Sequence, residues 1–477
     1  MKHRKFVLTL SACAVALLVS GMAWAAKGGI PGKPPPSDEE PDPMDYPFYF
    51  WRLGHMDGPH DSSKALGISR DGKVAVGATV VVDFNRAWRM DVDWAISTED
   101  DGQPPLYNEL QVQEDIGKVA PSQFSAAYAA SDMTTETCSY DKVAENYDWC
   151  GSLPVGSLDI GEVSYGIEWL LPPLASTDTT FENGIDYWTM PDFGGGISDM
   201  KVHDVSADGV ILVGTGNTQL GLTAFYADIN VLDENGVPLA NQLTIQDAVT
   251  LQTLRYSSAQ AVSADGTIIA GFGGTQQGNL PFVATVLDAT TDPITLESTI
   301  LPRPGGGKFA EAYAMTPDGT VIAGRTDTPK GPVACIWFRD ATQTDSPWVV
   351  KPLGSLSKKS KDSMATGIAY RGDPVVGDYM VVGWSKSILY DSEAFVWSGN
   401  ATLEEDEIGY FYDLEYILTK TGAAEASSMG SEWILNQATG ISDLGDRIVG
   451  WGTNPEGGIE AWLVDGYPLG ELVLTHE

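Results

Sequence analysis

The sequence predicts an all-β protein with a β-propeller fold, in which seven blades are favoured over six. Three observations indicate this fold: a short unit recurs along most of the chain, the units follow at the spacing of a four-stranded blade, and helical periodicity is nearly absent. A short helix is expected only within 412–426. We expect a signal peptide at 1–25, a Pro-rich disordered linker at 26–45 and the propeller at 46–477.

The recurring unit is a short apolar strand, a polar turn that usually contains Asp-Gly, and a second apolar strand that ends in glycine. Asp-Gly suits a tight turn because glycine adopts the positive φ that the turn requires. The closing glycine lets backbones approach closely where strands crowd. The sequence contains six copies, at 67–77, 204–214, 261–271, 314–324, 367–383 and 440–450.

A third strand with an aromatic residue follows the copies. We expect most of these rings to lie in the core between blades, because blade packing needs large apolar side chains at repeated positions. The rings at these positions include Trp88, Phe225, Phe282, Phe395 and Trp462.

The spacing of the units sets the number of blades. The turn aspartates of the later copies lie 53 to 57 residues apart, but Asp71 and Asp208 are 137 residues apart. An insertion or a degenerate blade therefore lies at about 101–190. Residues 186–192 look like the aromatic strand of a hidden blade, which favours seven.

The two ends of the folded region are also aromatic strands, at 48–51 and 461–464. Strands from both ends can complete one blade, which leaves no open sheet edge.

The first residues have the pattern of an export signal. Lys2, Arg4 and Lys5 precede an apolar run over 6–22, and small residues precede a cleavage site after Ala25. We therefore expect a secreted protein, extracellular or periplasmic, with no membrane span after cleavage. Leu-Ser-Ala-Cys at 10–13 is an alternative lipoprotein site, with lipidation at Cys13, but it would leave a very short apolar core.

The net charge excludes some partners. The chain has 65 acidic and 28 basic residues and a formal net charge of −37. Such a surface repels nucleic acid and anionic lipid, because both are bound by Lys and Arg that neutralise phosphates.

Cysteine usage agrees with export. Cys138 and Cys150 lie in a polar segment, and an exported protein can hold them as a disulfide. Cys335 lies in an apolar run, where we expect a buried hydrophobic side chain and not a nucleophile.

The repeat resembles the bacterial HAF-type extracellular repeat, which is recognised by a Ser-Ala-Asp-Gly turn, a Val-rich strand ending in Gly, and a His-Ala-Phe strand. The turns at 206–209 and 263–266 match well, and 413–442 resembles the family's terminal unit. Arg, Thr and Glu replace the family's histidine. The resemblance covers roughly 46–100 and 190–466, and it implies an exported propeller without a settled activity.

Few residues point to catalysis or to a cofactor. Asp91 and Asp93 would share one strand face, as a glycosidase pair could, but such pairs arise by chance among so many acids. No zinc-protease spacing is found among His55, His60, His203 and His476, and no nucleophile elbow occurs. Calcium is the favoured metal, although no Asp-x-Asp-x-Asp-Gly loop is present. The sequence thus assigns no catalytic, cofactor-binding or metal-binding residue.

Residues 101–165 match no copy of the repeat. Long insertions on a rigid scaffold often carry individual function, so its rings are candidates for ligand contact. They are Tyr128, Tyr140, Tyr147 and Trp149.

The favoured function is that of an exported, non-enzymatic binding or surface-interaction protein, a monomer whose ligand, a protein or a polysaccharide, is unknown. The alternative is a polysaccharide-active hydrolase or lyase with carboxylates from several blades at the propeller mouth. A third interpretation is a structural component of an extracellular matrix. The fold does not decide between these functions.

Overall fold

The structure is a computed structural model. It describes the residues 48–54, 60–81, 84–92, 114–115, 124–132, 140–141, 146–147, 154–160, 163–170, 186–189, 198–218, 221–232, 238–246, 253–275, 278–289, 294–304, 307–339, 348–359, 361–371, 377–401, 409–420 and 433–466.

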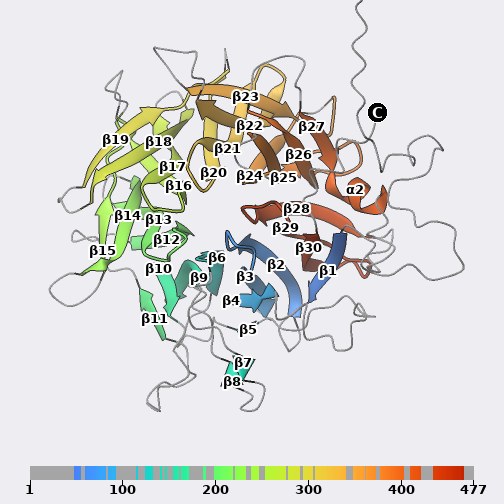
Figure 1. The fold of residues 1–477 in the computed structure, drawn as a ribbon, viewed down its shortest axis with the longest axis horizontal. Helices are drawn as coiled ribbons and strands as arrows, with labels where there is room; N and C mark the ends of the chain where they lie inside the picture. The colour runs from blue at the N-terminus through green and yellow to red at the C-terminus, as the bar shows by residue number, and fades with distance from the viewer. Residues whose placement is uncertain are drawn as a thin grey trace, which may run out of the picture.

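Antiparallel sheets are arrayed around a common centre, which gives a nearly all-β, propeller-like fold (Figure 1). The predicted fold class is confirmed to this extent. The innermost strands in the described part of the chain are β2 (His60–Ile68), β6 (Phe124–Ala130), β12 (Ser198–Val205), β16 (Tyr256–Val262), β20 (Ala310–Met315), β24 (Ser363–Tyr370) and β28 (Ile434–Ile441). In chain order each of these strands contacts the next, and β28 contacts β2.

Four sheets are separate four-stranded meanders with the chain order kept from the centre outward. The first is β12 (Ser198–Val205), β13 (Ile211–Thr218), β14 (Gly221–Leu232) and β15 (Pro238–Gln242). The second is β16 (Tyr256–Val262), β17 (Ile268–Thr275), β18 (Gly278–Asp288) and β19 (Thr295–Ile300). The third is β20 (Ala310–Met315), β21 (Val321–Thr328), β22 (Gly331–Arg339) and β23 (Trp348–Gly354). The fourth is β24 (Ser363–Tyr370), β25 (Asp378–Ser385), β26 (Glu393–Asn400) and β27 (Tyr410–Asp413).

The other large group of strands forms one hydrogen-bonded path, β11-β10-β9-β6-β4-β3-β2-β30-β29-β28. Single parallel pairs, Asn85 with Phe124 and Ser62 with Ile459, join its three antiparallel parts. The first part is β2 (His60–Ile68), β3 (Val74–Val81), β4 (Phe84–Asp91) and β5 (Glu114–Asp115). The second is β6 (Phe124–Ala130), β9 (Pro154–Ile160), β10 (Val163–Leu170) and β11 (Asp186–Thr189). The third is β28 (Ile434–Ile441), β29 (Arg447–Thr453), β30 (Ile459–Gly466) and β1 (Phe48–Gly54).

The two ends of the described chain share a sheet. β1 runs antiparallel to β30, with Phe48 opposite Gly466 and Trp51 opposite Leu463. The predicted pairing of the two aromatic end strands is confirmed. A separate short hairpin joins β7 (Tyr140–Asp141) and β8 (Asn146–Tyr147).

One strand was placed wrongly by its aromatic pattern. Residues 186–192 were expected to form the third, aromatic strand of a hidden blade, but β11 lies outermost, beyond β10. The third position belongs to β10, whose Trp169 faces Tyr187 of β11 in the strand register. Two neighbouring strands with aromatic residues cannot be ordered by composition alone.

The core lies between neighbouring sheets. Phe225 on β14 and Phe282 on β18 are fully buried, as expected for the third-strand rings. One cluster joins side chains of β13 and β14 to those of β16, β17 and β18. Fully buried rings at the equivalent positions are Trp88, Phe395 and Trp462.

The Asp-Gly turns have the predicted backbone. Gly209 has a φ of 77° and Gly266 a φ of 75°, a region that glycine adopts without strain. The serine of each turn explains the rest of the motif: Ser206 Oγ donates to Asp208 Oδ1 (2.6 Å) and accepts from Ile211 N (2.9 Å). The motif thus folds through its own hydrogen bonds.

The closing glycines lie where two backbones meet. A Cβ on Gly271 would lie 2.0 Å from Ser258 O, and one on Gly214 would lie 1.9 Å from Lys201 O. Real Cβ atoms do not come so close to a carbonyl oxygen. The prediction of close backbone approach is confirmed, and the neighbour is the innermost strand of the same sheet.

The short helix predicted within 412–426 is α2 (Leu414–Lys420). Asp413 caps it, because its Oδ1 accepts from Glu415 N at 2.9 Å. Cys335 is fully buried and burial raises the pKa of its thiol, so it is a core side chain as expected. Cys138 and Cys150 lie outside the described residues, as do the segments predicted to be the signal peptide and the linker. No helix among the described residues is long and apolar enough to cross a membrane.

Candidate functional site: the central cavity

A β-bulge recurs at the same place on each innermost strand. The pairing register of β12 skips from Val202 to Asp204, and that of β16 skips from Ala259 to Ala261. A bulged residue leaves the ladder, so that its side chain can be aimed elsewhere. The skipped residues are Leu66, Tyr128, His203, Gln260, Tyr313, Thr366 and Thr439.

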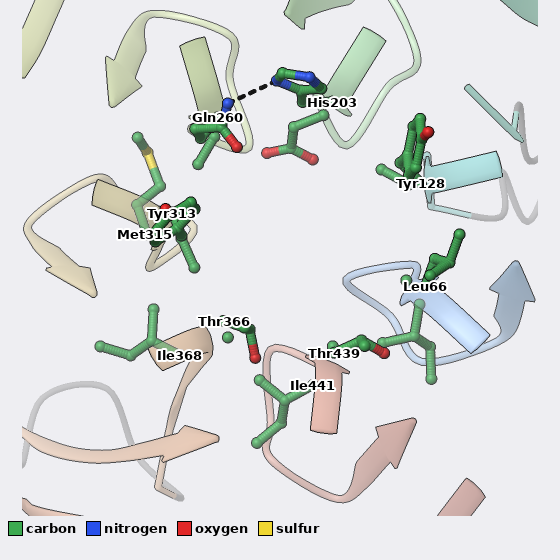
Figure 2. Close-up of a pocket in the computed structure, with 18 of the residues that line it drawn as sticks. Leu66, Tyr128, His203, Gln260, Tyr313, Met315, Thr366, Ile368, Thr439 and Ile441 are labelled. Carbon is green, nitrogen blue, oxygen red and sulfur yellow. Dashed lines mark hydrogen bonds between the residues drawn. The ribbon is translucent and has the colours of Figure 1, made fainter. Parts of the chain in front are cut away.

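These seven bulge residues line one cavity of about 460 Å³ at the centre of the described sheets. Figure 2 shows that they come from different strands and face a common space. The volume falls in the range of small-molecule sites, about 300–1,000 Å³.

One side of the cavity is polar and aromatic. The ring of Tyr128 meets the ring of His203 edge-on at 6.4 Å between centroids. His203 Nδ1 is in turn 2.8 Å from the amide nitrogen of Gln260 (Figure 2). Three neighbouring innermost strands, β6, β12 and β16, thus present a continuous polar wall.

His203 is neutral at neutral pH. Burial lowers the pKa of its imidazole to about 4. Nδ1 is engaged by two neighbours, because it lies 2.8 Å from Ala259 O and 2.8 Å from Gln260 Nε2. Nε2 is the ring nitrogen outside these two contacts.

The opposite side of the cavity combines two hydroxyl groups with apolar side chains. Thr366 and Thr439 lie there, next to Leu66, Ile368 and Ile441 (Figure 2). The cavity therefore has one polar and aromatic side and one side on which apolar side chains flank two threonine hydroxyls.

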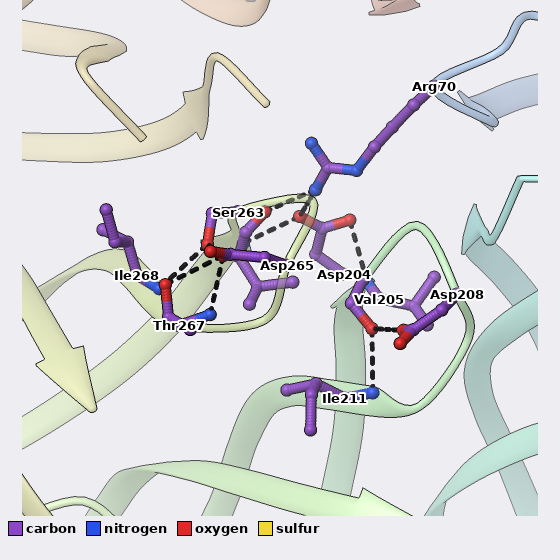
Figure 3. Close-up of polar contacts among 11 residues, drawn as sticks. Arg70, Asp204, Val205, Asp208, Ile211, Ser263, Asp265, Thr267 and Ile268 are labelled. Carbon is purple, nitrogen blue, oxygen red and sulfur yellow. Dashed lines mark hydrogen bonds and ion pairs between the residues drawn. The ribbon is translucent and has the colours of Figure 1, made fainter. Parts of the chain in front are cut away.

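An arginine extends over the mouth on the side of the turns. Arg70 comes from the turn between β2 and β3, and its Nη2 contacts Asp204 Oδ2 (3.4 Å) and the carbonyl oxygen of Val262 (Figure 3). Asp204 is held further by Val262 N and Val205 N, both at 2.9 Å. This carboxylate is occupied by structural bonds, although burial raises its pKa.

Further carboxylates surround the arginine. Burial raises the pKa of Asp443 to about 7; Arg70 opposes the rise, while Asp132 and Asp204 add to it. Burial also raises the pKa of Asp132, whose Oδ1 accepts from Asp71 N at 2.8 Å. The mouth is therefore acidic around one cation.

Backbone hydrogen bonds join successive turns around this mouth. Asp443 N donates to Arg70 O (2.7 Å), and Ala264 N donates to Pro317 O (2.8 Å). Pro317 has no N–H, so it donates no bond to the turn that follows it. The other bonds of the series are Asp132 N to Ala207 O, Ala207 N to Ala264 O, and Tyr370 N to Asp443 O.

The structure places the residues considered from sequence in different ways. Tyr128 and His203 line the cavity. Asp93, Trp149, His55 and His476 lie outside the described residues. Only the backbone is described for Asp91, His60, Tyr140 and Tyr147. Among the described residues, no group of three or more His, Cys, Asp or Glu side chains could hold a metal ion.

Sequence reasoning missed five of the seven bulge residues. Their position was available in the repeat, because His203, Gln260 and Tyr313 each stand five residues before the turn aspartate of their copy. The position was passed over because its residue type changes from copy to copy. The missed residues are Leu66, Gln260, Tyr313, Thr366 and Thr439.

No family model and no curated protein matches this chain. Solved structures similar to it include TolB from Acinetobacter baumannii, at 14% identity over 61% of this chain and 53% of that one, with a TM-score of 0.34. Oligogalacturonate lyase from Vibrio parahaemolyticus is similar at 10% identity over 88% and 96% of the two chains, with a TM-score of 0.46. Prolyl oligopeptidase B from Galerina marginata is similar at 10% identity over 86% and 47%, with a TM-score of 0.36. The chain thus spans about half the length of the TolB structure.

Proposed function

We propose that this protein is an exported, non-enzymatic binding protein built on a seven-bladed propeller, and that its ligand enters the central cavity. The observation that carries the proposal is the contrast between a repeated backbone structure and a varied set of side chains that line the cavity. The turn, the bulge and the closing glycine repeat from sheet to sheet, whereas the side chain at the bulge differs. A repeated scaffold with a varied lining is suited to recognition.

The count of seven blades is supported by three features of the described chain. It contains seven innermost strands, each with its bulge. A closing glycine on the partner strand of each one packs closely against its backbone. The long interval at 101–190 supplies one innermost strand and its partner strands. The equivalent glycines are Gly77, Gly156, Gly214, Gly271, Gly324, Gly383 and Gly450.

Binding is favoured over catalysis because two of the acids at the mouth, Asp204 and Asp132, are already engaged. Asp204 accepts two backbone N–H bonds and contacts Arg70, and Asp132 accepts from Asp71 N. No bulge residue is a carboxylate. An acid–base pair would need groups free to reach a substrate.

The export signal, the monomeric state, the disulfide between Cys138 and Cys150 and the membership of the HAF-type family are parts of this proposal. They rest on the sequence patterns alone. Mass spectrometry of the exported protein tests two of them, through the N-terminal residue after cleavage and the thiol count of the non-reduced chain.

A screen of a mixed small-molecule library by ligand-observed NMR tests the proposed cavity. The variant Leu66→Trp fills the cavity from its apolar side, and no hydrogen bond is lost because a leucine side chain makes none. We expect compounds that bind the wild-type protein and fail to bind this variant. Binding that is unchanged in the filled variant would place the ligand elsewhere and refute the proposal.

A polysaccharide-active hydrolase or lyase is the second candidate, and Asp443 is the observation in its favour. A carboxyl with a pKa of about 7 is suited to general acid catalysis. Incubation with neutral and uronic polysaccharides, followed by assays for new reducing ends and for unsaturated products, tests this candidate. Product formation by the wild-type protein but not by Asp443→Asn would replace the binding proposal with catalysis.

A further inference from the structure

We propose that the central cavity binds a neutral, polyhydroxylated ligand, one or two sugar units in size, through hydrogen-bond acceptors on its wall. The inference rests on the proposed binding function and adds the chemical class of the ligand. Two features carry it: the bulge residues are uncharged at neutral pH, and several of them have already donated their protons to the protein.

The middle of the cavity offers no counter-charge. His203 is neutral there, and its neighbours are tyrosine, glutamine, threonine and leucine. The charged lining residues are not among the bulge residues: Arg70 and Asp204 are mutually engaged at the mouth, and Lys201 is exposed. Asp443 lies beside Arg70, to whose carbonyl oxygen its N–H donates. A charged ligand group placed among the bulge residues would lose its hydration without gaining an opposite charge, which favours a neutral ligand there.

The threonine hydroxyls have used their protons. Thr366 Oγ1 donates to Ala438 O at 2.7 Å, and Thr439 Oγ1 donates to Ala65 O at 3.0 Å. A hydroxyl has a single proton and two lone pairs, so each oxygen can now only accept. Both bonds also link one innermost strand to the next, which holds the oxygens in place.

A tyrosine hydroxyl is in the same state. Tyr313 Oη donates to Glu311 Oε2 at 2.7 Å, so its oxygen can accept but not donate. His203 Nδ1 is engaged as well, because it lies 2.8 Å from both Ala259 O and Gln260 Nε2. The cavity wall therefore favours a ligand that supplies hydrogen-bond donors.

Neutral sugar units meet these requirements. Their hydroxyl groups supply donors, they carry no charge, and their C–H faces suit aromatic rings and the apolar side of the cavity formed by Leu66, Ile368 and Ile441. A ligand with only carbonyl or ether oxygens would meet lone pairs on the wall and bind poorly.

Calorimetric titration with three sets of disaccharides tests the inference on the full exported chain. The neutral set is cellobiose, maltose and lactose; the anionic set is a dimer of galacturonate, and the cationic set is a dimer of glucosamine. We expect a neutral disaccharide to bind more tightly than both charged ones. Stronger binding of a charged dimer would overturn the inference.

Substitutions at the threonines test the role of the acceptors. Thr366→Val and Thr439→Val keep the side-chain shape and remove one acceptor each. We expect each to weaken binding of the neutral disaccharide by about three- to tenfold, the effect of losing one hydrogen bond. Thr326→Val on β21 is the matched control, because Thr326 Oγ1 is buried without a hydrogen-bond partner.

The outcomes separate this inference from the proposed function. If both threonine variants bind as tightly as the Thr326→Val control, the ligand class is wrong. If compounds of another class bind the wild-type cavity and are blocked by Leu66→Trp, the inference fails and the binding function stands. If no compound of any class is blocked by Leu66→Trp, both fail.

Discussion

Arg70 and Asp204 are 134 positions apart in the sequence, yet Arg70 Nη2 lies 3.4 Å from Asp204 Oδ2 at the mouth of the central cavity. Both side chains are mostly buried, at 13% and 22% exposure. Arg70 also contacts the carbonyl oxygen of Val262, so that one side chain ties the turn after β2 to the sheets of β12 and β16.

Replacing Arg70 should destabilise the fold. The variant Arg70→Met leaves the Asp204 carboxylate largely buried without its cation, and we expect a loss of roughly 2–4 kcal/mol in the free energy of unfolding. Urea denaturation measures this loss. The double variant Arg70→Met/Asp204→Asn should recover part of it, because the uncompensated charge is then absent. Equal stability of wild type and single variant would show that the contact does not hold the mouth.

The stability of the protein should depend on the ionisation of Asp443. Its folded-state pKa is raised by burial to about 7, above the ordinary value of 3.8. The neutral form is thus favoured by folding, and the contribution is fully present below about pH 4 and is lost as the pH rises through 7. Relative to Asp443→Asn, the wild-type protein should lose roughly 1–3 kcal/mol of unfolding free energy between pH 4 and pH 8. This range allows for screening by solvent, because the side chain is partly exposed.

Asp265 should contribute a pH dependence of stability with the opposite sign, and it serves as the control for Asp443. Burial opposes ionisation of Asp265, but bonds from Ser263 and Thr267 outweigh it, and its pKa is lowered. Its stabilising contribution should be present at neutral pH and lost as the pH falls below the ordinary aspartate range. Thermal unfolding across pH of Asp443→Asn and Asp265→Asn should therefore show differences from wild type with opposite slopes. Parallel slopes would refute both assignments.

Buried serines should link neighbouring sheets. Ser257 Oγ on β16 accepts from Ala224 N on β14 at 2.9 Å. The variant Ser257→Ala leaves a buried N–H unpaired, and we expect a loss of about 1–3 kcal/mol in unfolding free energy. Ser398→Ala is the matched control, since Ser398 Oγ is buried with no partner and its removal should be neutral or stabilising. Similar losses in both variants would mean that only packing at these positions matters.

The closing glycines should not tolerate a side chain. Gly271→Ala would bring a methyl group within 2.0 Å of Ser258 O, and we expect a loss of about 2–3 kcal/mol as the two strands move apart. Gly458→Ala is the control, because its Cβ would meet nothing closer than 3.4 Å. Guanidinium denaturation of both variants measures the difference. A tolerated alanine at Gly271 would contradict the close packing of β16 on β17.

Much of the fold was predictable because each repeat unit folds through interactions among residues close together in the sequence. The turn Ser263, Asp265 and Gly266 forms its own hydrogen bonds and its own positive φ, without help from the rest of the chain. Phe282 occupies a third-strand position that favours an apolar ring, because the position is buried between sheets. Such local and repeated features can be recognised from residue types and from their spacing.

The cavity was not predictable in the same way. Gln260 and Thr366 face it because of bulges, and a bulge shows only in the pairing register. The contact between Arg70 and Asp204 depends on how the sheets are arrayed, which no local pattern encodes. Asp443 resembles any solvated turn acid in the sequence, and its raised pKa arises from neighbours on other turns.

An experimental structure of the protein soaked with its tightest-binding neutral disaccharide tests the central claim most directly. We predict that the sugar lies inside the central cavity, with hydroxyl groups about 2.7–3.0 Å from the oxygens of Thr366 and Thr439. A disaccharide found on the outer face of the sheets, with the cavity free of ligand, would contradict the account.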